Sequence, residues 1–226
     1  MIKIQTLEIA GFAPALHGMR NPKNSWYLAD SIHDEGADNF IDFTIGENDM
    51  RLAMSLAAAG PVHAKYRRMI VVYADILAPL YWWKEYDTLK VGTVANSCST
   101  MHKIHDKEFT EDDFSCEHLI SEKWSEADNY SGAKPMDVLR ETIRSLNESR
   151  MNYLFCKAQG DTARQKMFWW QMIQSLPSTY NQMRTVMLNY EVLANICKYR
   201  AGHKLDEWHT FIDWAKSLPY SNLFTE

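Results

Sequence analysis

The segment Ala78–His102, APLYWWKEYDTLKVGTVANSCSTMH, decides how this chain is interpreted. Immediately before it, the aliphatic run within Arg68–Leu77 predicts a buried strand that ends at Pro79. The segment then continues as a predicted helix over Leu80–Tyr86, followed by asparagine, serine, threonine, cysteine and histidine side chains. Polar side chains clustered directly behind a buried strand are typical of a site that carries chemistry.

Composition predicts one domain over residues 1–226, because 46% of the residues are apolar and 23% are charged. The net charge is −5, yet residues 106–128 alone hold nine carboxylates against two lysines. We therefore expect an acidic surface excursion at about residues 103–133, and a slightly positive remainder with 22 basic and 20 acidic residues. The lack of a clustered basic stretch argues against binding to duplex nucleic acid, while a small anionic ligand stays compatible with the sequence.

The cysteines are widely spaced, which favours free thiols in a reducing cytosol: Cys98, Cys116, Cys156 and Cys197. Met1–Ala10 alternates like a strand and lacks the long apolar region of a signal peptide. The most apolar run, Met69–Trp83, is too short for a membrane span and carries Asp75. We expect a cytoplasmic protein that does not enter a membrane.

The first part of the chain predicts alternating strands and helices. Ile2–Ile9 has the alternation of a strand, and Gly11–Arg20 predicts a short helix broken at Pro14. A second helix over Asn48–Ala59 would be capped by Asn48 or Asp49 and end at Gly60.

The second part predicts mainly helices. The expected helices are Cys116–Glu122, Met136–Ala158 behind Pro135, a helix from the Asp161 cap to Gln174, a long helix from a Ser178 or Thr179 cap to Arg200, and Leu205–Ser217. The sequence thus indicates a mixed α+β protein with a helical C-terminal half.

The stretch from Leu176-Pro177 to His203 resembles the flavin-dependent thymidylate synthases. In that family a Leu-Pro pair precedes a helix with two asparagines six residues apart and an arginine five residues further on. Asn189, Asn195 and Arg200 keep these spacings.

The same family has a strand ending in Ala-Pro, a helix, and then the signature Arg-His-Arg-x-x-Ser-x-x-x-x-Ser-x-Arg. Anchored on Ala78-Pro79, this signature falls without a gap on residues 88–100. Lys90 keeps a positive charge, Thr93 keeps a hydroxyl, and Cys98 stands where the family has the serine beside the uracil. Thr88, Leu89 and Thr100 replace an arginine, a histidine and an arginine, so the chain resembles a diverged branch.

The resemblance implies an α+β fold with a central antiparallel sheet flanked by helices, assembled as a homotetramer whose sites form between subunits. It implies binding of FAD and a pyrimidine nucleotide. It also implies a reaction in which NADPH reduces FAD and methylenetetrahydrofolate supplies a one-carbon unit to the base, in a methyltransferase or hydroxymethyltransferase. Loss of three signature cations weakens this last expectation, because developing negative charge on the uracil needs preorganised positive partners.

Cys98 and Lys90 are the predicted catalytic residues. A Cys98 thiolate could attack C6 of a bound pyrimidine or pack against it, and Lys90 would lower its pKa. The alternative is that Cys98 is a buried, inert thiol.

The remaining site residues follow from the resemblance and from local charge. The expected cofactor-binding residues are Asn189, Asn195, His63, Arg67 and Arg68, and the expected substrate-binding residues are Arg200, Asn96, Ser97, Ser99, Lys84 and Glu85. On one continuous helix, Asn189 and Arg200 would project from nearly the same face. The alternatives are that Asn189 faces solvent, that Asn195 caps or hydrogen-bonds a neighbour, and that Arg200 complements the helix C-terminus. For His63 the alternative is a solvated loop, and for Lys84 and Glu85 it is a surface ion pair.

Other interpretations stay open. A metal site is disfavoured because the histidines and cysteines of residues 98–118 lack metal-ligand spacing. The tryptophan-rich stretches Tyr81–Trp83 and Phe168–Trp170 are typical of a core or a subunit interface. Besides an enzyme, the sequence allows a noncatalytic nucleotide-binding or sequestering protein, or an interaction protein that uses its acidic segment.

Overall fold

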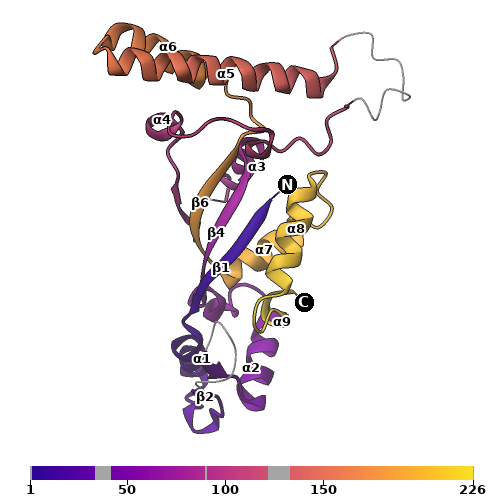
Figure 1. Ribbon diagram of the computed structural model, residues 1–226. Coiled ribbons are helices and arrows are strands. Elements are labelled where there is room, and N and C mark those ends of the chain that lie inside the picture. The colour runs from indigo at the N-terminus through magenta and orange to yellow at the C-terminus, as the bar shows by residue number, and fades with distance from the viewer. Residues whose placement is uncertain (1, 34–41, 90, 122–132, 226) are drawn as a thin grey trace. The chain divides into compact units, whose positions relative to one another are not determined.

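The computed structural model describes residues 2–33, 42–89, 91–121 and 133–225, and these form two compact units (Figure 1). The sheet unit comprises Ile2–Leu77, Glu85–Asn96 and Arg184–Glu226. The hairpin unit comprises Ala78–Lys84 and Ser97–Met183. The single-domain organisation stays a prediction.

The main sheet has four strands in the order β1 (Lys3–Ala10), β4 (Val71–Pro79), β6 (Asn181–Asn189) and β5 (Val94–Ser97). β1 pairs antiparallel with β4 from Lys3 opposite Leu77 to Ala10 opposite Val71, with an irregularity between Thr6 and Glu8. A second, two-stranded antiparallel sheet joins β2 (Ile32–His33) and β3 (Phe43–Thr44). The mixed α+β class with an antiparallel sheet is therefore confirmed.

Helices cover one face of the strands in the sheet unit. Val72, Ala74 and Ile76 alternate along β4 and are fully buried, as period-two alternation requires of a strand with one covered face. The covering helices are α7 (Tyr190–Arg200), α8 (Asp206–Lys216) and α9 (Asn222–Thr225), and Figure 1 shows α7 and α8 on one side of β1 and β4. The Trp214 indole on α8 donates a hydrogen bond to Thr6 Oγ1 at 3.0 Å.

A buried ion pair holds the two N-terminal helices, α1 (Phe12–Arg20) and α2 (Glu47–Ala58), together. Arg20 Nε donates to Asp49 Oδ1 at 2.6 Å, with the Arg20 side chain 3% exposed and that of Asp49 2% exposed. Asp49 also accepts from the Ser31 hydroxyl at 2.6 Å and from the Asp30 and Ser31 amides. Short 3₁₀ turns complete this region at η1 (Asn21–Lys23), η2 (Trp26–Leu28) and η3 (Lys65–Arg68).

The hairpin unit is built on two long helices, α5 (Pro135–Ala158) and α6 (Thr162–Ser175), which lie side by side (Figure 1). Asp161 caps α6 by accepting from the Arg164 amide at 3.0 Å, as its position before the helix predicts. Shorter elements are α3 (Leu80–Tyr86), α4 (Thr100–Lys103) and η4 (Glu111–Asp113). Buried residues of this core include Leu139, Leu146 and Met172.

The acidic segment contributes to this core as well as to the surface. Phe109 and Phe114 are each 4% exposed and pack with the buried residues of α5 and α6, whereas Glu108, Glu111 and Asp112 are exposed. Over the part that the structure describes, the segment is therefore anchored by its aromatic residues.

Several local predictions were wrong. The expected long helix from Ser178 or Thr179 to Arg200 is instead the strand β6 followed by α7, because Thr185–Leu188 alternates exposed and buried residues with period two. Pro14 does not break α1, since it lies in the first turn, where a missing amide costs no hydrogen bond.

Two further boundaries were misjudged. The N-cap of α2 is Gly46 and not Asn48 or Asp49 as expected. The Asp49 carboxylate instead pairs with Arg20. The chain forms only a turn at Cys116–Leu119 where a helix over Cys116–Glu122 was expected, and Glu122 lies outside the described residues.

Candidate functional site

Asn189 joins strand β6 to helix α7 in the sheet unit. It is the N-cap of α7, and its Oδ1 accepts a hydrogen bond from the Val192 amide at 3.0 Å. The residue is only 9% exposed. The expectation that Asn189 projects from one helix face together with Arg200 is therefore wrong. The Asn189 side-chain oxygen is used by the helix cap, and its side-chain nitrogen does not take part in the cap.

The predicted signature segment meets Asn189 through Gly92. A Cβ built on Gly92 would lie 2.8 Å from Asn189 Nδ2 and 3.2 Å from a Val192 methyl carbon. Gly92 also has a φ of +80°, which residues with a side chain rarely adopt. The backbone at Gly92 thus lies against the start of α7. Lys90 lies outside the described residues.

Arg200, at the end of α7, is held by two partners in the same unit. Its Nη1 lies 3.5 Å from Glu85 Oε2, and its guanidinium carbon lies 5.1 Å from the centre of the Trp208 ring. Two predicted substrate-binding residues, Arg200 and Glu85, therefore contact one another. The Arg200 side chain is 23% exposed, so it is partly accessible.

A pocket of about 550 Å³ lies beside α7 in the sheet unit, and we call it the α7 pocket. Arg67 and Asn195, both predicted to bind a cofactor, line it. The full lining is Ala57, Gly60, Pro61, Arg67, Glu191, Ala194, Asn195, Cys197, Lys198, Tyr199, Lys216, Phe224 and Thr225. Its volume is within the range of sites for small molecules and cofactors.

Arg67 is a buried cation in the lining of this pocket. Its side chain is 9% exposed, and its Nη1 lies 4.0 Å from Glu191 Oε2, a long separation for an ion pair. Arg67 Nε and Glu191 Oε2 are both buried without a hydrogen-bond partner among the described residues. Burial raises the pKa of the neighbouring Tyr66, whereas Arg67 opposes this rise and Glu191 adds to it. A buried guanidinium with an unused donor suits an anionic ligand.

Two other predicted cofactor residues do not line the α7 pocket. His63 is exposed in a turn, and its backbone amide donates to the Gly60 carbonyl at 2.9 Å. In sequence it is two residues after Pro61, which does line the pocket. Arg68 is exposed at the end of η3. Their side chains are accessible, and their role stays a prediction.

Cys98 lies in the hairpin unit, directly after β5, and is exposed rather than buried. Its amide donates to the Met183 carbonyl at 2.9 Å, and its carbonyl accepts from Gln182 Nε2 at 2.8 Å. These bonds fix the backbone and leave the thiol accessible.

The other predicted substrate residues differ in whether the side chain is exposed or already forms a hydrogen bond within the protein. Asn96 and Ser97 are exposed on β5, and Lys84 is exposed on α3. Ser99, in contrast, caps α4, because its hydroxyl accepts from the His102 amide at 3.0 Å. Asn96 belongs to the sheet unit, and Lys84, Ser97 and Ser99 belong to the hairpin unit.

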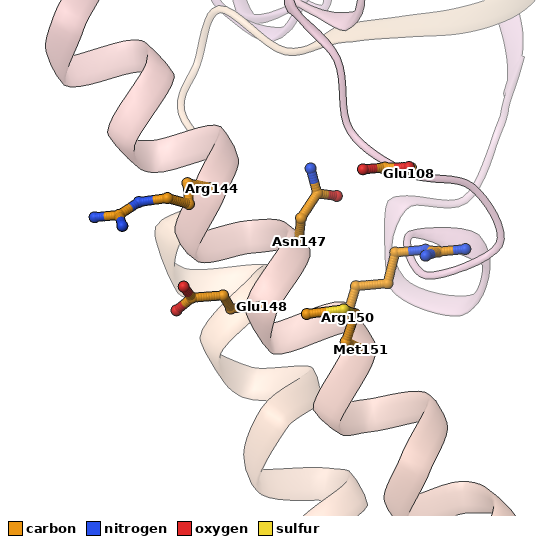
Figure 2. Close-up of a pocket in the computed structure, with 6 residues that line it drawn as sticks. All are labelled: Glu108, Arg144, Asn147, Glu148, Arg150 and Met151. Atoms are coloured by element: carbon orange, nitrogen blue, oxygen red, sulfur yellow. The ribbon is translucent and has the colours of Figure 1, made fainter.

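A second pocket, of about 420 Å³, lies in the hairpin unit along α5 (Figure 2). Arg144 is paired with Glu141, and Arg150 donates to the His105 carbonyl at 2.9 Å; Figure 2 shows the two guanidinium groups pointing away from one another. Asn147 uses both of its polar atoms on the backbone of Phe109, at 2.9 Å each. These groups serve the fold, so this pocket is a weaker candidate than the α7 pocket.

No group of three histidine, cysteine, aspartate or glutamate side chains suited to a metal ion occurs within the described residues. None of the helices in the described part of the chain is long and apolar enough to cross a membrane.

The sequence did not point to Glu191, Lys198 or Lys216. Glu191, Asn195 and Lys198 are four and three residues apart and so share one face of α7, which is a recognisable signal. Lys216 comes from a different helix, and only the packing of α8 brings it to this pocket.

Comparison with known proteins gives a likeness of fold. A crystal structure of the flavin-dependent thymidylate synthase ThyX from Helicobacter pylori, complexed with FAD and dUMP, aligns with a TM-score of 0.63 over 98% of this chain and 97% of that one, at 14% identity. A second ThyX structure from Helicobacter pylori with FAD and dUMP gives a TM-score of 0.62 over 100% of this chain and 97% of that one, at 13% identity.

The comparison at the level of sequence finds nothing: no protein-family model and no curated protein matches the chain. The chain therefore has the fold of the flavin-dependent thymidylate synthase ThyX at very low sequence identity. The fold expected from the resemblance is confirmed, and residue roles rest on the geometry of this chain itself.

Proposed function

We propose that this protein binds FAD and a pyrimidine deoxynucleotide. The observation that carries the proposal is the α7 pocket, which brings the predicted cofactor residues Arg67 and Asn195 together on a fold shared with an FAD- and dUMP-binding synthase. The buried Arg67 Nε adds support because it is an unused donor on a predicted cofactor residue. The contact between Gly92 and Asn189 adds support because it joins the segment aligned with the signature to another predicted cofactor residue.

The residues available fit a phosphate-bearing cofactor. Arg67 and Asn195 would hold it from the η3 side and from α7, and the nearby backbone at Gly60 is open, with no atom within 4 Å of a Cβ there. When bound, FAD would supply the redox chemistry, with NADPH as the reductant and methylenetetrahydrofolate as the one-carbon donor if the reaction of the resembled family is retained. The protein would then act as a nucleotide methyltransferase or hydroxymethyltransferase.

In this proposal Arg200 and Asn96, both in the sheet unit, contact the nucleotide. For the hairpin unit we propose separately that Ser97 and Cys98 contact a pyrimidine, because both are exposed and the Cys98 thiol is accessible.

A second candidate is a noncatalytic nucleotide-binding protein on the same fold. The contact between Glu85 and Arg200 favours it, because a carboxylate already neutralises the cation expected to bind the substrate. Thr88, Leu89 and Thr100 also leave the signature segment with fewer cations than a reaction that builds negative charge requires.

Assembly as a homotetramer in the cytoplasm belongs to the same proposal. The face of β4 and β6 opposite α7 carries Tyr73, Thr185 and Met187, which are exposed or half-buried. Such a partly apolar sheet face suits contact with another copy of the chain. Light scattering coupled to gel filtration would measure four copies, and a monomer at all concentrations would contradict this part.

The test of flavin binding is the visible absorption spectrum of the purified protein, followed by denaturation and identification of any released chromophore. We expect bound FAD, or uptake of added FAD at a ratio of one per chain. A colourless protein that takes up no FAD would contradict the cofactor part of the proposal.

The test of nucleotide binding uses the exposed thiol. Alkylation of Cys98 by iodoacetamide, followed by mass spectrometry, should be slowed by dUMP. The buried Cys156 serves as the internal reference. An unchanged rate of Cys98 alkylation at saturating dUMP would remove Cys98 from the nucleotide site.

A further inference from the structure

The α7 pocket has an excess of positive charge in a chain whose net charge is −5. Three basic residues line it, namely Arg67, Lys198 and Lys216, against one acidic residue, Glu191. Glu191 is the partner of Arg67, although at 4.0 Å. Neither lysine forms an ion pair with a described residue, and Lys198 Nζ lies 5.3 Å from the centre of the neighbouring Tyr199 ring.

The three cations come from separate elements of the sheet unit. Arg67 lies on η3, Lys198 on the last turns of α7, and Lys216 at the end of α8. A lysine at a helix C-terminus complements the helix dipole, which alone would account for Lys216. The helix dipole does not explain why three cations line one pocket. It also does not explain why the buried Arg67 guanidinium there has an unused Nε donor.

The rest of the lining suits a planar ring. Pro61, Tyr199 and Phe224 offer apolar or aromatic surface at the same pocket. A ligand with both a ring and negative charge would therefore use the whole lining, and a nucleoside diphosphate group is such a ligand.

We propose that Lys198 and Lys216, with Arg67, bind the diphosphate group of a nucleotide. In FAD this diphosphate belongs to the ADP portion of the molecule. This inference rests on the proposed function for the identity of FAD, but the diphosphate contact itself is independent of the flavin ring. Lys198 and Lys216 are binding residues that neither the signature nor the paired asparagines indicate.

The experiment measures binding of ADP, FAD and riboflavin to the full chain by isothermal titration calorimetry. The variants are Lys198→Ala, Lys216→Ala and the double variant. Lys204→Ala removes the same charge from an exposed lysine that does not line the pocket and serves as the matched control. Both lysines of the pocket are exposed, so the variants should fold, which unchanged thermal unfolding would verify.

We expect each pocket variant to weaken ADP and FAD binding at least tenfold, and the double variant to weaken it further. Riboflavin, which has no phosphate, should bind equally to all variants, and the ADP affinity should fall with added salt. The Lys204→Ala control should bind ADP like the unmodified chain.

Two results would overturn the inference: Lys198→Ala and Lys216→Ala behaving like Lys204→Ala, or an unmodified chain that binds neither ADP nor FAD. In the first case, FAD binding by the unmodified chain would leave the proposed function intact. Lysine-dependent ADP binding without any flavin binding would support the diphosphate site and reject FAD as the cofactor. An unmodified chain that binds neither ligand would contradict both proposals, whereas each of the other two results contradicts only one of them.

Discussion

Gly92 lies so close to Asn189 that a single added methyl group would reach 2.8 Å from the Asn189 amide nitrogen. The contact joins the segment that aligns with the family signature to the residue that begins α7. Two separate features favour glycine at position 92: its positive φ, and the lack of space for a side chain beside Asn189.

These two features can be separated by a pair of variants. Gly92→Ala should destabilise the protein by about 1–2 kcal/mol from its backbone conformation and by a further 1 kcal/mol or so from the clash. Gly160→Ala is the control, because Gly160 has a φ of +70° but no atom within 4 Å of its Cβ position. Urea unfolding measures both, and equal losses would mean that the contact with Asn189 carries no energy.

Asn189 has a capping role that can be distinguished from a ligand role. Asn189→Ala should cost about 1 kcal/mol of stability, because the Val192 amide loses its acceptor. Asn189→Asp keeps an acceptor and should retain the stability. If the amide nitrogen also serves the flavin, both variants should weaken FAD binding about tenfold in fluorescence titration. Normal FAD affinity in Asn189→Asp would leave Asn189 with the cap alone.

Under the proposed function, Glu85 would compete with the nucleotide for Arg200. The pair is partly exposed, at 23% for Arg200 and 44% for Glu85, so Glu85→Gln should change the stability by less than about 1 kcal/mol. The same change should tighten dUMP binding several-fold by calorimetry, because the guanidinium loses its competing carboxylate. Glu8→Gln, at an exposed position on β1, controls for overall charge. Unchanged dUMP affinity in Glu85→Gln would show that Arg200 does not contact the phosphate.

The buried pair of Arg20 and Asp49 should govern stability at acid pH. Burial raises the pKa of Asp49, but hydrogen bonds from Ser31 and Arg20 and from backbone amides outweigh it, so the pKa lies below its ordinary value. The pair therefore stabilises the protein fully above the unfolded pKa of about 3.9, and this contribution is lost as the pH falls through the lower folded value.

Asp49→Asn tests this pH dependence. It should cost about 3–5 kcal/mol at pH 7, because Arg20 is left as an unpaired buried charge, and it should flatten the fall in stability between pH 5 and pH 2. Urea unfolding across this range measures both effects, with Asp213→Asn at an exposed site of α8 as the control. A variant with the same acid-induced loss as the unmodified chain would assign that loss to other carboxylates.

The sequence by itself determined the elements whose signals are local. The aliphatic run of β4, the α3 helix behind Pro79, the Asp161 cap of α6 and the positions of α5 and α8 were all predicted, because periodicity and caps depend only on neighbouring residues. The spacing of Asn189, Asn195 and Arg200, through the resemblance it supports, also indicated the fold that the comparison with ThyX confirms.

Only the tertiary structure decided the partners. It made Thr185–Leu188 a strand, since pairing in the sheet overrode the helical interpretation, and so turned Asn189 from a helix-face residue into a cap. It also joined Arg20 to Asp49 across 29 positions, Arg67 to Glu191, and Lys216 to the α7 pocket. Contacts between distant residues depend on how whole elements pack, and no periodicity within one segment encodes them.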